Sequence, residues 1–194
     1  MLREKLKDYK IVLASGSPRR QQFFKELDLD FEIRIKEVEE IYPDTLQGVE
    51  ITNYLAKLKS AAFDNDIQPN EIIVTSDTIV WLDNKALGKP KDKQDAFLML
   101  QSMAGKTHEV ITSVCFKTKT KIDILNCVTR VTFNPISDAE ILFYIDKYQP
   151  FDKAGAYGIQ EWIGLMAINK IEGSYTNVVG LPTDLVYRYL SNLK

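Results

Sequence analysis

The chain has 194 residues, of which 45% are hydrophobic and 27% charged, and its formal net charge is −2. This size and composition predict one globular domain, residues 1–194, with an ample core. The charge gives no electrostatic reason to bind long nucleic acid, which usually requires a basic face. No apolar run approaches the roughly 20 residues of a membrane span, and the N-terminus lacks the apolar core of a signal peptide. We therefore expect a cytoplasmic protein with no membrane partner.

Strands and helices are interspersed along the chain. Residues 10–14 form an apolar strand, and a helix is expected at 18–27. Apolar and charged residues alternate at 31–35, as in a half-buried strand. The remaining predicted elements are a helix at 49–63, a strand at 71–82, a helix at 92–103, strands at 109–118 and 121–133, a helix at 137–147, a strand pair turning at 172–174 and a last helix from Pro182. This order predicts a mixed α/β fold.

Local signals mark several boundaries of these elements. Asp83 and Asn84 suit a hairpin turn. Asp92 is a good N-cap for the helix that follows it. Ser137 and Glu140 have the spacing of a capping box, in which each side chain bonds the other residue's backbone N–H.

The turn after the first strand carries an unusual set of charges. Ser17 suits an N-cap and Pro18 the first helical position. Arg19 and Arg20 then fall in the first helical turn, where a cation costs about 0.3–1 kcal/mol because the helix N-terminus is already positive. An anionic ligand would reverse that sign, since backbone N–H groups, two guanidinium groups and the hydroxyls of Ser15 and Ser17 could hold phosphate oxygens. The alternative is a solvated basic turn whose arginines pair with nearby carboxylates.

Asp77 is the second unusual position, because it lies in the middle of an apolar strand and is costly to bury unpaired. It is tied locally by Ser76 and Thr78, placed at a bend, or functional. As a functional group it would bind a divalent cation or deprotonate a water molecule. Mg²⁺ favours one or two carboxylates together with substrate phosphates. Glu39 and Glu40 could supply the second carboxylate, although an acidic loop is usually just solvated.

Three further features have both a functional and an ordinary interpretation. Lys59 and Lys89 could neutralise phosphate charge, but a lone lysine is by default a surface residue. The small residues of 152–160 permit close approach of a ligand, and the carboxamide of Gln160 could match the edge of thymine or uracil. A plain connecting loop is the alternative. His108, at the start of a strand, is expected to be structural.

Together these motifs resemble those of the Maf family of nucleoside triphosphate pyrophosphatases. The similarity runs essentially from end to end, in matching order and spacing. It comprises residues 13–20, Glu39-Glu40, Lys59, 76–78, 88–90, 107–112, 153–160 and 173–182. Two departures are mild: Ser76 stands where Ala is more usual, and Phe23-Phe24 replace a Leu pair.

The resemblance implies the fold of inosine triphosphate pyrophosphatases, which is a mixed, elongated β-sheet with flanking helices and two lobes around a cleft. It also implies a homodimer. The expected reaction is hydrolysis of dTTP and UTP, and of modified pyrimidine nucleotides, to the monophosphate and pyrophosphate with Mg²⁺ or Mn²⁺. The alternatives are the family branch that acts on 7-methyl-GTP and a nucleotide-binding regulator of septation with little catalysis.

The resemblance assigns proton abstraction to Asp77 and links Arg19, Thr78 and Gln160 to substrate choice. With the residue-level analysis, these assignments give a full candidate site. The residues expected to hold the triphosphate are Ser15, Ser17, Arg19, Arg20, Lys59 and Lys89. Those expected to hold the cation are Asp77, Glu39 and Glu40.

Overall fold

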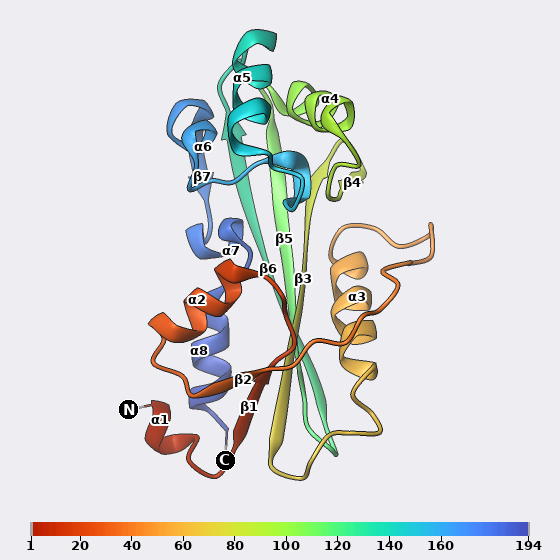
Figure 1. Ribbon diagram of the computed structural model, residues 1–194, viewed down its shortest axis with the longest axis vertical. Helices are drawn as coiled ribbons and strands as arrows, with labels where there is room; N and C mark the ends of the chain where they lie inside the picture. Colours follow the sequence, from red (N-terminus) through yellow and green to blue (C-terminus); the bar gives the residue numbers. More distant parts are fainter. Residues whose placement is uncertain (1, 194) are drawn as a thin grey trace. The chain divides into compact units, whose positions relative to one another are not determined.

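The computed structural model of the protein describes residues 2–193. Strands and helices are interspersed, as expected (Figure 1). The elements are α1 (Leu2–Lys5), β1 (Lys10–Leu13), α2 (Pro18–Glu26), β2 (Phe31–Ile33), α3 (Val49–Ala61), β3 (Glu71–Leu82), β4 (Lys85–Leu87), α4 (Lys93–Met103), β5 (Thr107–Lys117), β6 (Ile122–Phe133), α5 (Asp138–Tyr148), the 3-10 turn η1 (Ala154–Ala156), α6 (Trp162–Ala167), β7 (Ile168–Glu172), α7 (Tyr175–Val179) and α8 (Thr183–Ser191).

The strands form one mixed sheet in the order β2-β1-β3-β5-β6-β7, with β4 paired to β3. β1 runs parallel to both β2 and β3, whereas β4 is antiparallel to β3 and β7 is antiparallel to β6. The chain divides into two compact units. Unit 1 comprises the chain up to Asp77, Thr112–Cys127 and the chain from Gly180 onward, and unit 2 comprises Thr78–Ile111 and Val128–Val179. Among the described residues, no helix combines the length and apolarity needed to cross a bilayer.

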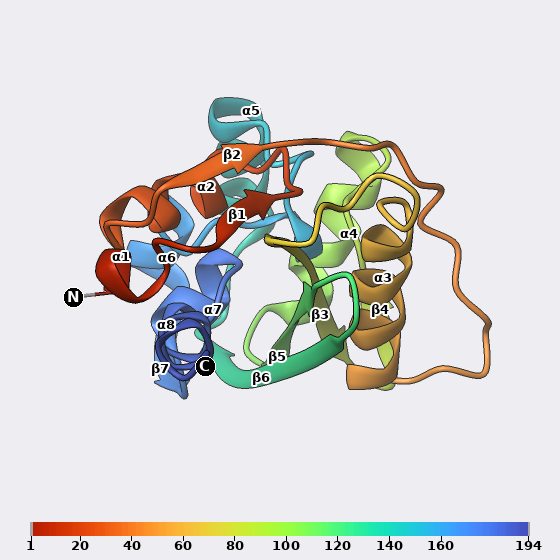
Figure 2. The same cartoon turned by 90° about the horizontal axis from the view of Figure 1, so that it is seen from below.

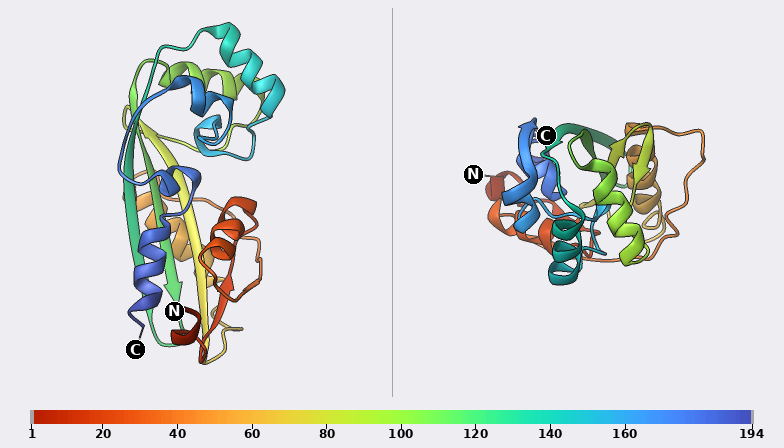
Figure 3. Two further views of the ribbon diagram at one scale, coloured as in Figure 1. Left: turned by 90° about the vertical axis from the view of Figure 1, so that its left-hand side faces the viewer. Right: turned by 90° about the horizontal axis from the view of Figure 1, so that it is seen from above.

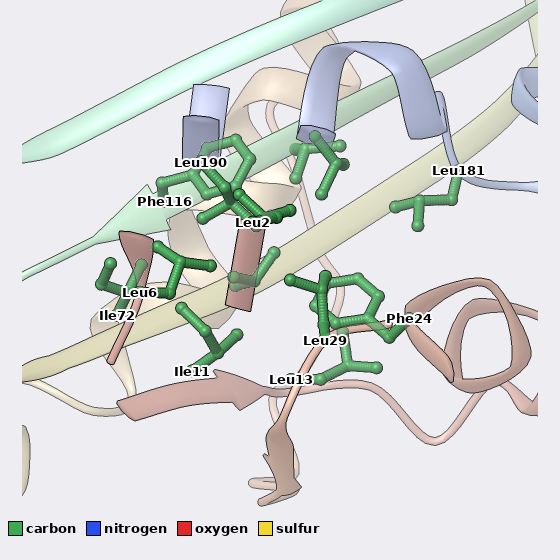
Figure 4. Packing of buried hydrophobic residues seen from close by; sticks show 13 residues of the cluster. Leu2, Leu6, Ile11, Leu13, Phe24, Leu29, Ile72, Phe116, Leu181 and Leu190 are labelled. Atoms are coloured by element: carbon green, nitrogen blue, oxygen red, sulfur yellow. The ribbon is translucent and has the colours of Figure 1, made fainter. Parts of the chain in front are cut away.

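In unit 1, side chains alternate between the two faces of the strands. One face packs against α1, α2 and α8, and Figure 4 shows this core from close by. Its members include Leu13 from β1, Ile72 from β3, Phe24 from α2 and Leu190 from α8, all buried. The other face carries Val12 and Ile73, which pack with Phe63 and Ile67 from the segment after α3. Figures 1 and 2 show α3 on this side of the strands. This part of β3 is thus covered on both faces, which explains the apolar run from Ile72 to Val74.

In unit 2, α4 and α5 lie side by side (Figure 3). Gly155 in η1 packs directly on β3, because a Cβ at this position would lie 2.7 Å from Val80 Cγ2. Its φ of +67° also favours glycine. The backbone N–H of Gly155 donates to Gly88 O at 3.0 Å. The loop of residues 152–160, called the glycine-rich loop below, is therefore fixed to the segment after β4.

The local boundary signals are confirmed. Asp83 and Asn84 both have positive φ and connect β3 to β4. Asp92 caps α4 by accepting from Asp95 N–H at 2.8 Å. The capping box of α5 is complete, with Ser137 and Glu140 bonding each other's backbone. Helix 49–63 ends earlier than predicted, at Ala61, and strand 31–35 is shorter, at Phe31–Ile33.

The predicted strand pair turning at 172–174 is wrong, because β7 is followed by the helix α7. Ser174 Oγ accepts the backbone N–H of Asn177 at 3.3 Å, which favours a helical turn. Asn177 is buried, and its Nδ2 donates to Val110 O and to Thr129 Oγ1, both at 2.9 Å. Hydrogen bonds to distant strands therefore override the strand propensity of the valines that follow Asn177.

Cys115 lies in β5 and Cys127 in β6, and both are free thiols. The short helices α1 and α6 were not expected, because neither carries a strong capping or periodicity signal.

A buried ion pair at the start of β3 predicts how stability varies with pH. The guanidinium of Arg34 binds both oxygens of Glu71, at 2.8 and 3.1 Å, and the Glu71 side chain is 2% exposed. These bonds from Arg34 lower the pKa of Glu71 despite its burial. The stabilisation is therefore fully present above the unfolded pKa of about 4.3 and is lost as the pH falls through the lower pKa of the folded state.

We expect Glu71→Gln to lower the free energy of unfolding by about 1–3 kcal/mol at pH 7, since Arg34 loses a charged partner. Urea unfolding at pH 7 and at steps from pH 5 to pH 3 measures this, and the difference from the parent protein should shrink in acid. Glu37→Gln, at an exposed loop position, is the control and should change little. A difference that stayed constant down to pH 3 would contradict the ion-pair explanation.

His108 anchors the glycine-rich loop from inside unit 2. Its ring is 1% exposed, and its Nε2 lies 2.8 Å from the hydroxyl of Tyr157, a loop residue. Phe133 packs edge-to-face on the imidazole, with centroids 4.9 Å apart. Burial lowers the pKa of His108 to about 4. Between pH 6.5 and 4 the unfolded chain therefore takes up a proton that the folded protein excludes, so stability falls as the pH falls.

Because the chain has one histidine, this slope can be assigned to a single group. We expect the unfolding free energy to fall by up to about 1.4 kcal/mol per pH unit in this window from His108 alone. In His108→Gln, whose amide can still reach Tyr157, that part of the slope should vanish, which parallel urea titrations can show. An unchanged slope would mean that other groups cause it.

Candidate active site

The turn between β1 and α2 has the charge pattern of an anion site. Ser17 occupies the N-cap position of α2, but its side chain makes no capping hydrogen bond, which corrects the expectation that it caps the helix. Its backbone N–H instead donates to Oγ of the buried Ser15 at 3.3 Å. No acidic residue lies in the first turn. The positive end of the helix is therefore not offset within its own first turn.

The second arginine of this turn, Arg20, bonds two backbone carbonyls. Arg20 donates from Nε to Gly180 O at 2.9 Å and from Nη1 to Ser76 O at 3.0 Å. Burial lowers the pKa of Arg20, and the nearby charge of Asp77 opposes this effect. Arg19 is half-buried on the same turn. Arg20 thus ties α2 to β3 and to the segment before α8, a structural task that the sequence did not indicate.

Asp77 lies in β3 with its side chain 8% exposed. Lys59 from α3 binds it, since Lys59 Nζ donates to Asp77 Oδ1 at 2.7 Å. Successive side chains of a strand point to opposite faces, so Ser76 points away from Asp77. The hydroxyl of Ser76 is buried and has no hydrogen-bond partner among the described residues. The charge of Asp77 is therefore compensated from α3, on the face that carries Thr75 and Asp77.

Lys59 contacts a second carboxylate as well. Its Nζ lies 3.0 Å from Oε2 of Glu40, in the acidic loop, and its side chain is 19% exposed. The structure thus brings Glu40, Lys59 and Asp77 together within unit 1. Glu39 is exposed on the same loop. The sequence assigned a phosphate role to Lys59 and gave no signal for this pairing, because the three residues are far apart in the chain.

Two carboxylate oxygens, from Asp77 and Glu40, lie within 3.0 Å of one ammonium nitrogen. Such an oxygen pair fits a hard divalent cation such as Mg²⁺ or Mn²⁺. In the part of the chain that the structure describes, no group of three or more His, Cys, Asp or Glu side chains could hold a metal ion. A cation bound by this pair would therefore need further oxygen ligands from water or phosphate.

The remaining candidates, Thr78, Lys89 and Gln160, belong to unit 2. Thr78 is half-buried in β3, directly after Asp77, and Lys89 and Gln160 are exposed. Lys89 follows Gly88, whose carbonyl accepts from the glycine-rich loop that Gln160 ends. Unit 2 therefore connects the segments that carry these two exposed side chains.

An ion pair and hydrogen bonds that the sequence did not indicate hold the glycine-rich loop in place. Lys153 Nζ pairs with Glu161 Oε1 at 3.1 Å, and Tyr144 donates its hydroxyl proton to Glu161 Oε2. The hydroxyl of Tyr144 in turn accepts from Gly158 N–H at 3.0 Å. Burial, followed by the bond to Glu161, raises the pKa of Tyr144. Gln160 is thus an exposed amide on a loop held from within, an arrangement suited to reading a flat ligand edge.

Comparison with a solved structure agrees with this architecture. The structure of the Staphylococcus aureus Ham1 protein matches with a TM-score of 0.55 and 16% sequence identity, over 95% of this chain and 100% of that chain. At such low identity the likeness shows the fold alone. It confirms the expected mixed sheet flanked by helices.

Sequence relatives are much closer. Proteins named dTTP/UTP pyrophosphatase from Flavobacterium johnsoniae and Christiangramia forsetii are 68% and 53% identical over 193 residues, covering 100% of this chain and 100% and 98% of theirs. One from Bacteroides fragilis is 50% identical over 95% of this chain and 96% of its own length. The family model described as Maf-like protein matches residues 10–193. The chain therefore belongs to the Maf family.

Proposed function

We propose that the protein is a nucleoside triphosphate pyrophosphatase that hydrolyses dTTP and UTP to the monophosphate and pyrophosphate. The names of relatives up to 68% identical over the whole chain support the reaction and its substrates. The observation that carries the proposal in the structure is the buried Asp77, paired to Lys59 in the middle of β3. An acidic group held there at the cost of desolvation is suited to chemistry rather than to folding.

In this proposal the positive end of α2 and the side chains around it bind the triphosphate. Ser15, Ser17 and Arg19 supply hydroxyl and guanidinium donors, and Lys89 adds positive charge from unit 2. Arg20 contributes charge while keeping its backbone partners, so its main task is to position the α2 turn against β3. Thr78 and Gln160 contact the sugar and base, with the Gln160 amide matching the carbonyl and imide N–H of thymine or uracil.

Asp77 accepts a proton from the attacking water molecule. The water oxygen forms a bond to the α-phosphorus, the bond from that phosphorus to the bridging oxygen breaks, and pyrophosphate leaves with the electron pair. A divalent cation, Mg²⁺ or Mn²⁺, held by Asp77 with Glu40 or Glu39, would offset the charge that develops on the phosphates. General-base help of this kind contributes about 10²–10⁴-fold in rate.

The whole chain, residues 1–194, is proposed to act as one Maf-like domain, which the match over residues 10–193 supports. A cytoplasmic homodimer is proposed with it, from the family resemblance. Size-exclusion chromatography with light scattering tests the dimer directly.

Release of monophosphate and pyrophosphate from dTTP, UTP, CTP, GTP, 7-methyl-GTP and ATP, with Mg²⁺ or Mn²⁺, tests the proposed function. We expect dTTP and UTP to be turned over fastest. Asp77→Asn should lower kcat at least about 10²-fold, since the proton acceptor is lost while the side-chain shape is kept. Asp83→Asn, in the exposed β3–β4 turn, is the matched control and should keep full turnover.

Each other outcome of this panel points to a different activity. Turnover of 7-methyl-GTP alone would place the protein in the other branch of the family. Tight dTTP binding without turnover in folded protein would favour a nucleotide-binding regulator. Near-normal turnover by Asp77→Asn would remove Asp77 from the proton transfer.

Base reading by Gln160 has its own test. Gln160→Ala should lower kcat/KM for dTTP and UTP by about tenfold, because a neutral hydrogen-bond pair contributes about 0.5–1.5 kcal/mol. The value for CTP should change much less, since cytosine presents the wrong edge to the amide. Gln101→Ala, at an exposed position of α4, serves as the control. A uniform loss across all nucleotides would argue against base reading.

A further inference from the structure

The ammonium of Lys59 is held by two acidic groups from different elements. Lys59 lies in the last turn of α3, and its Nζ contacts Asp77 in β3 at 2.7 Å and Glu40 in the acidic loop at 3.0 Å. Asp77 and Lys59 are largely buried, with side chains 8% and 19% exposed. The point between the two carboxylates is therefore taken by a positive charge that belongs to the chain itself.

A divalent cation held by the same two carboxylates needs that same point. An ammonium is a compact charge on a flexible four-carbon stem, so it can move while its backbone stays in place. Two cations cannot occupy the same position between one pair of oxygens, because they would clash and their charges repel. Binding of one therefore requires departure of the other.

We infer that Lys59 is a tethered competitor of the divalent cation, and that its ammonium leaves the position between Asp77 and Glu40 when the cation binds there. The inference rests on the proposed function. It assigns to Lys59 the cation position between its two acidic partners in the free protein.

This competition couples the cation to the nucleotide. Without phosphates, a displaced Lys59 loses two anionic partners, so cation binding is weak. With a triphosphate present, phosphate oxygens supply both the missing cation ligands and a new partner for the ammonium. Each ligand then favours the other by the same factor. The free protein is thereby kept from holding a cation before its substrate arrives.

If the Lys59–Asp77 salt bridge is permanent and only holds Asp77 in place, the opposite change in cation affinity is expected when Lys59 is removed. If Lys59 positioned the carboxylates for the cation, its removal would weaken cation binding. If Lys59 competes, removal strengthens it. The sign of the effect on cation affinity therefore separates the two.

The experiment is a titration of nucleotide-free protein with Mn²⁺, in which electron paramagnetic resonance reports free Mn²⁺. Lys59→Met keeps the length of the side chain and removes its charge, and we expect its Mn²⁺ dissociation constant to be about tenfold lower than that of the parent protein. This factor corresponds to an ammonium in place in about nine-tenths of the molecules. Lys59→Arg should remain weak, and Lys57→Met, exposed on the same helix, should match the parent protein.

Equal or weaker Mn²⁺ binding by Lys59→Met, or no binding by either protein, would overturn the inference. A second measurement needs no variant and so is independent of folding. Acetylation of lysines in the parent protein, quantified by mass spectrometry, should show Lys59 becoming severalfold more reactive when Mn²⁺ is added, with Lys57 as the internal reference. Unchanged Lys59 reactivity under saturating Mn²⁺ would also overturn it. Neither readout involves turnover, so failure of the proposed hydrolysis would appear separately in the nucleotide panel.

Discussion

The burial of one carboxylate, Asp77, constrains much of unit 1. A buried charge in the middle of a strand is tolerated only when it is paired, and the partner of Asp77 is Lys59 from α3. The position of Lys59 depends on how α3 packs against the strands. Thr75, on the same face of β3, donates to Ala56 O at 2.6 Å, and Ser113 in β5 donates to Asn53 Oδ1 at 2.7 Å. Buried polar bonds of this kind fix the helix against the strands more specifically than apolar packing alone.

Arg20, from α2 on the other face of β3, also joins a helix to this strand through a charged side chain. It bonds the carbonyls of Ser76 and Gly180, so one guanidinium joins α2, β3 and the segment before α8. Carbonyl oxygens carry only partial charge, and the charge of Arg20 also interacts with Asp77. A group that helps to hold the fold can in this way still contribute to an electrostatic environment that favours phosphate.

Signals that act over a few residues could be predicted from the sequence. The Asp92 cap, the capping box at Ser137 and the hairpin turn depend on neighbouring residues, and all are present. Asp77 stood out because its strand is otherwise apolar. What could not be predicted is which distant group compensates each charge: the partner of Asp77 is 18 residues away, and the carbonyls bound by Arg20 are 56 and 160 residues away. The α7 error has the same origin, since contacts with distant strands decide the conformation of that segment.

The residues proposed for chemistry and those proposed for base reading belong to different compact units. The glycine-rich loop that carries Gln160 is held by Glu161 and Tyr144, which also belong to unit 2. The residues that hold Gln160 differ from those that hold Asp77, so the base preference can change while the hydrolytic residues stay intact. Thr78 is the exception, because it adjoins Asp77 in the same strand and any backbone shift there moves the carboxylate. A substitution at Thr78 is therefore expected to change the rate together with the substrate choice proposed for this position.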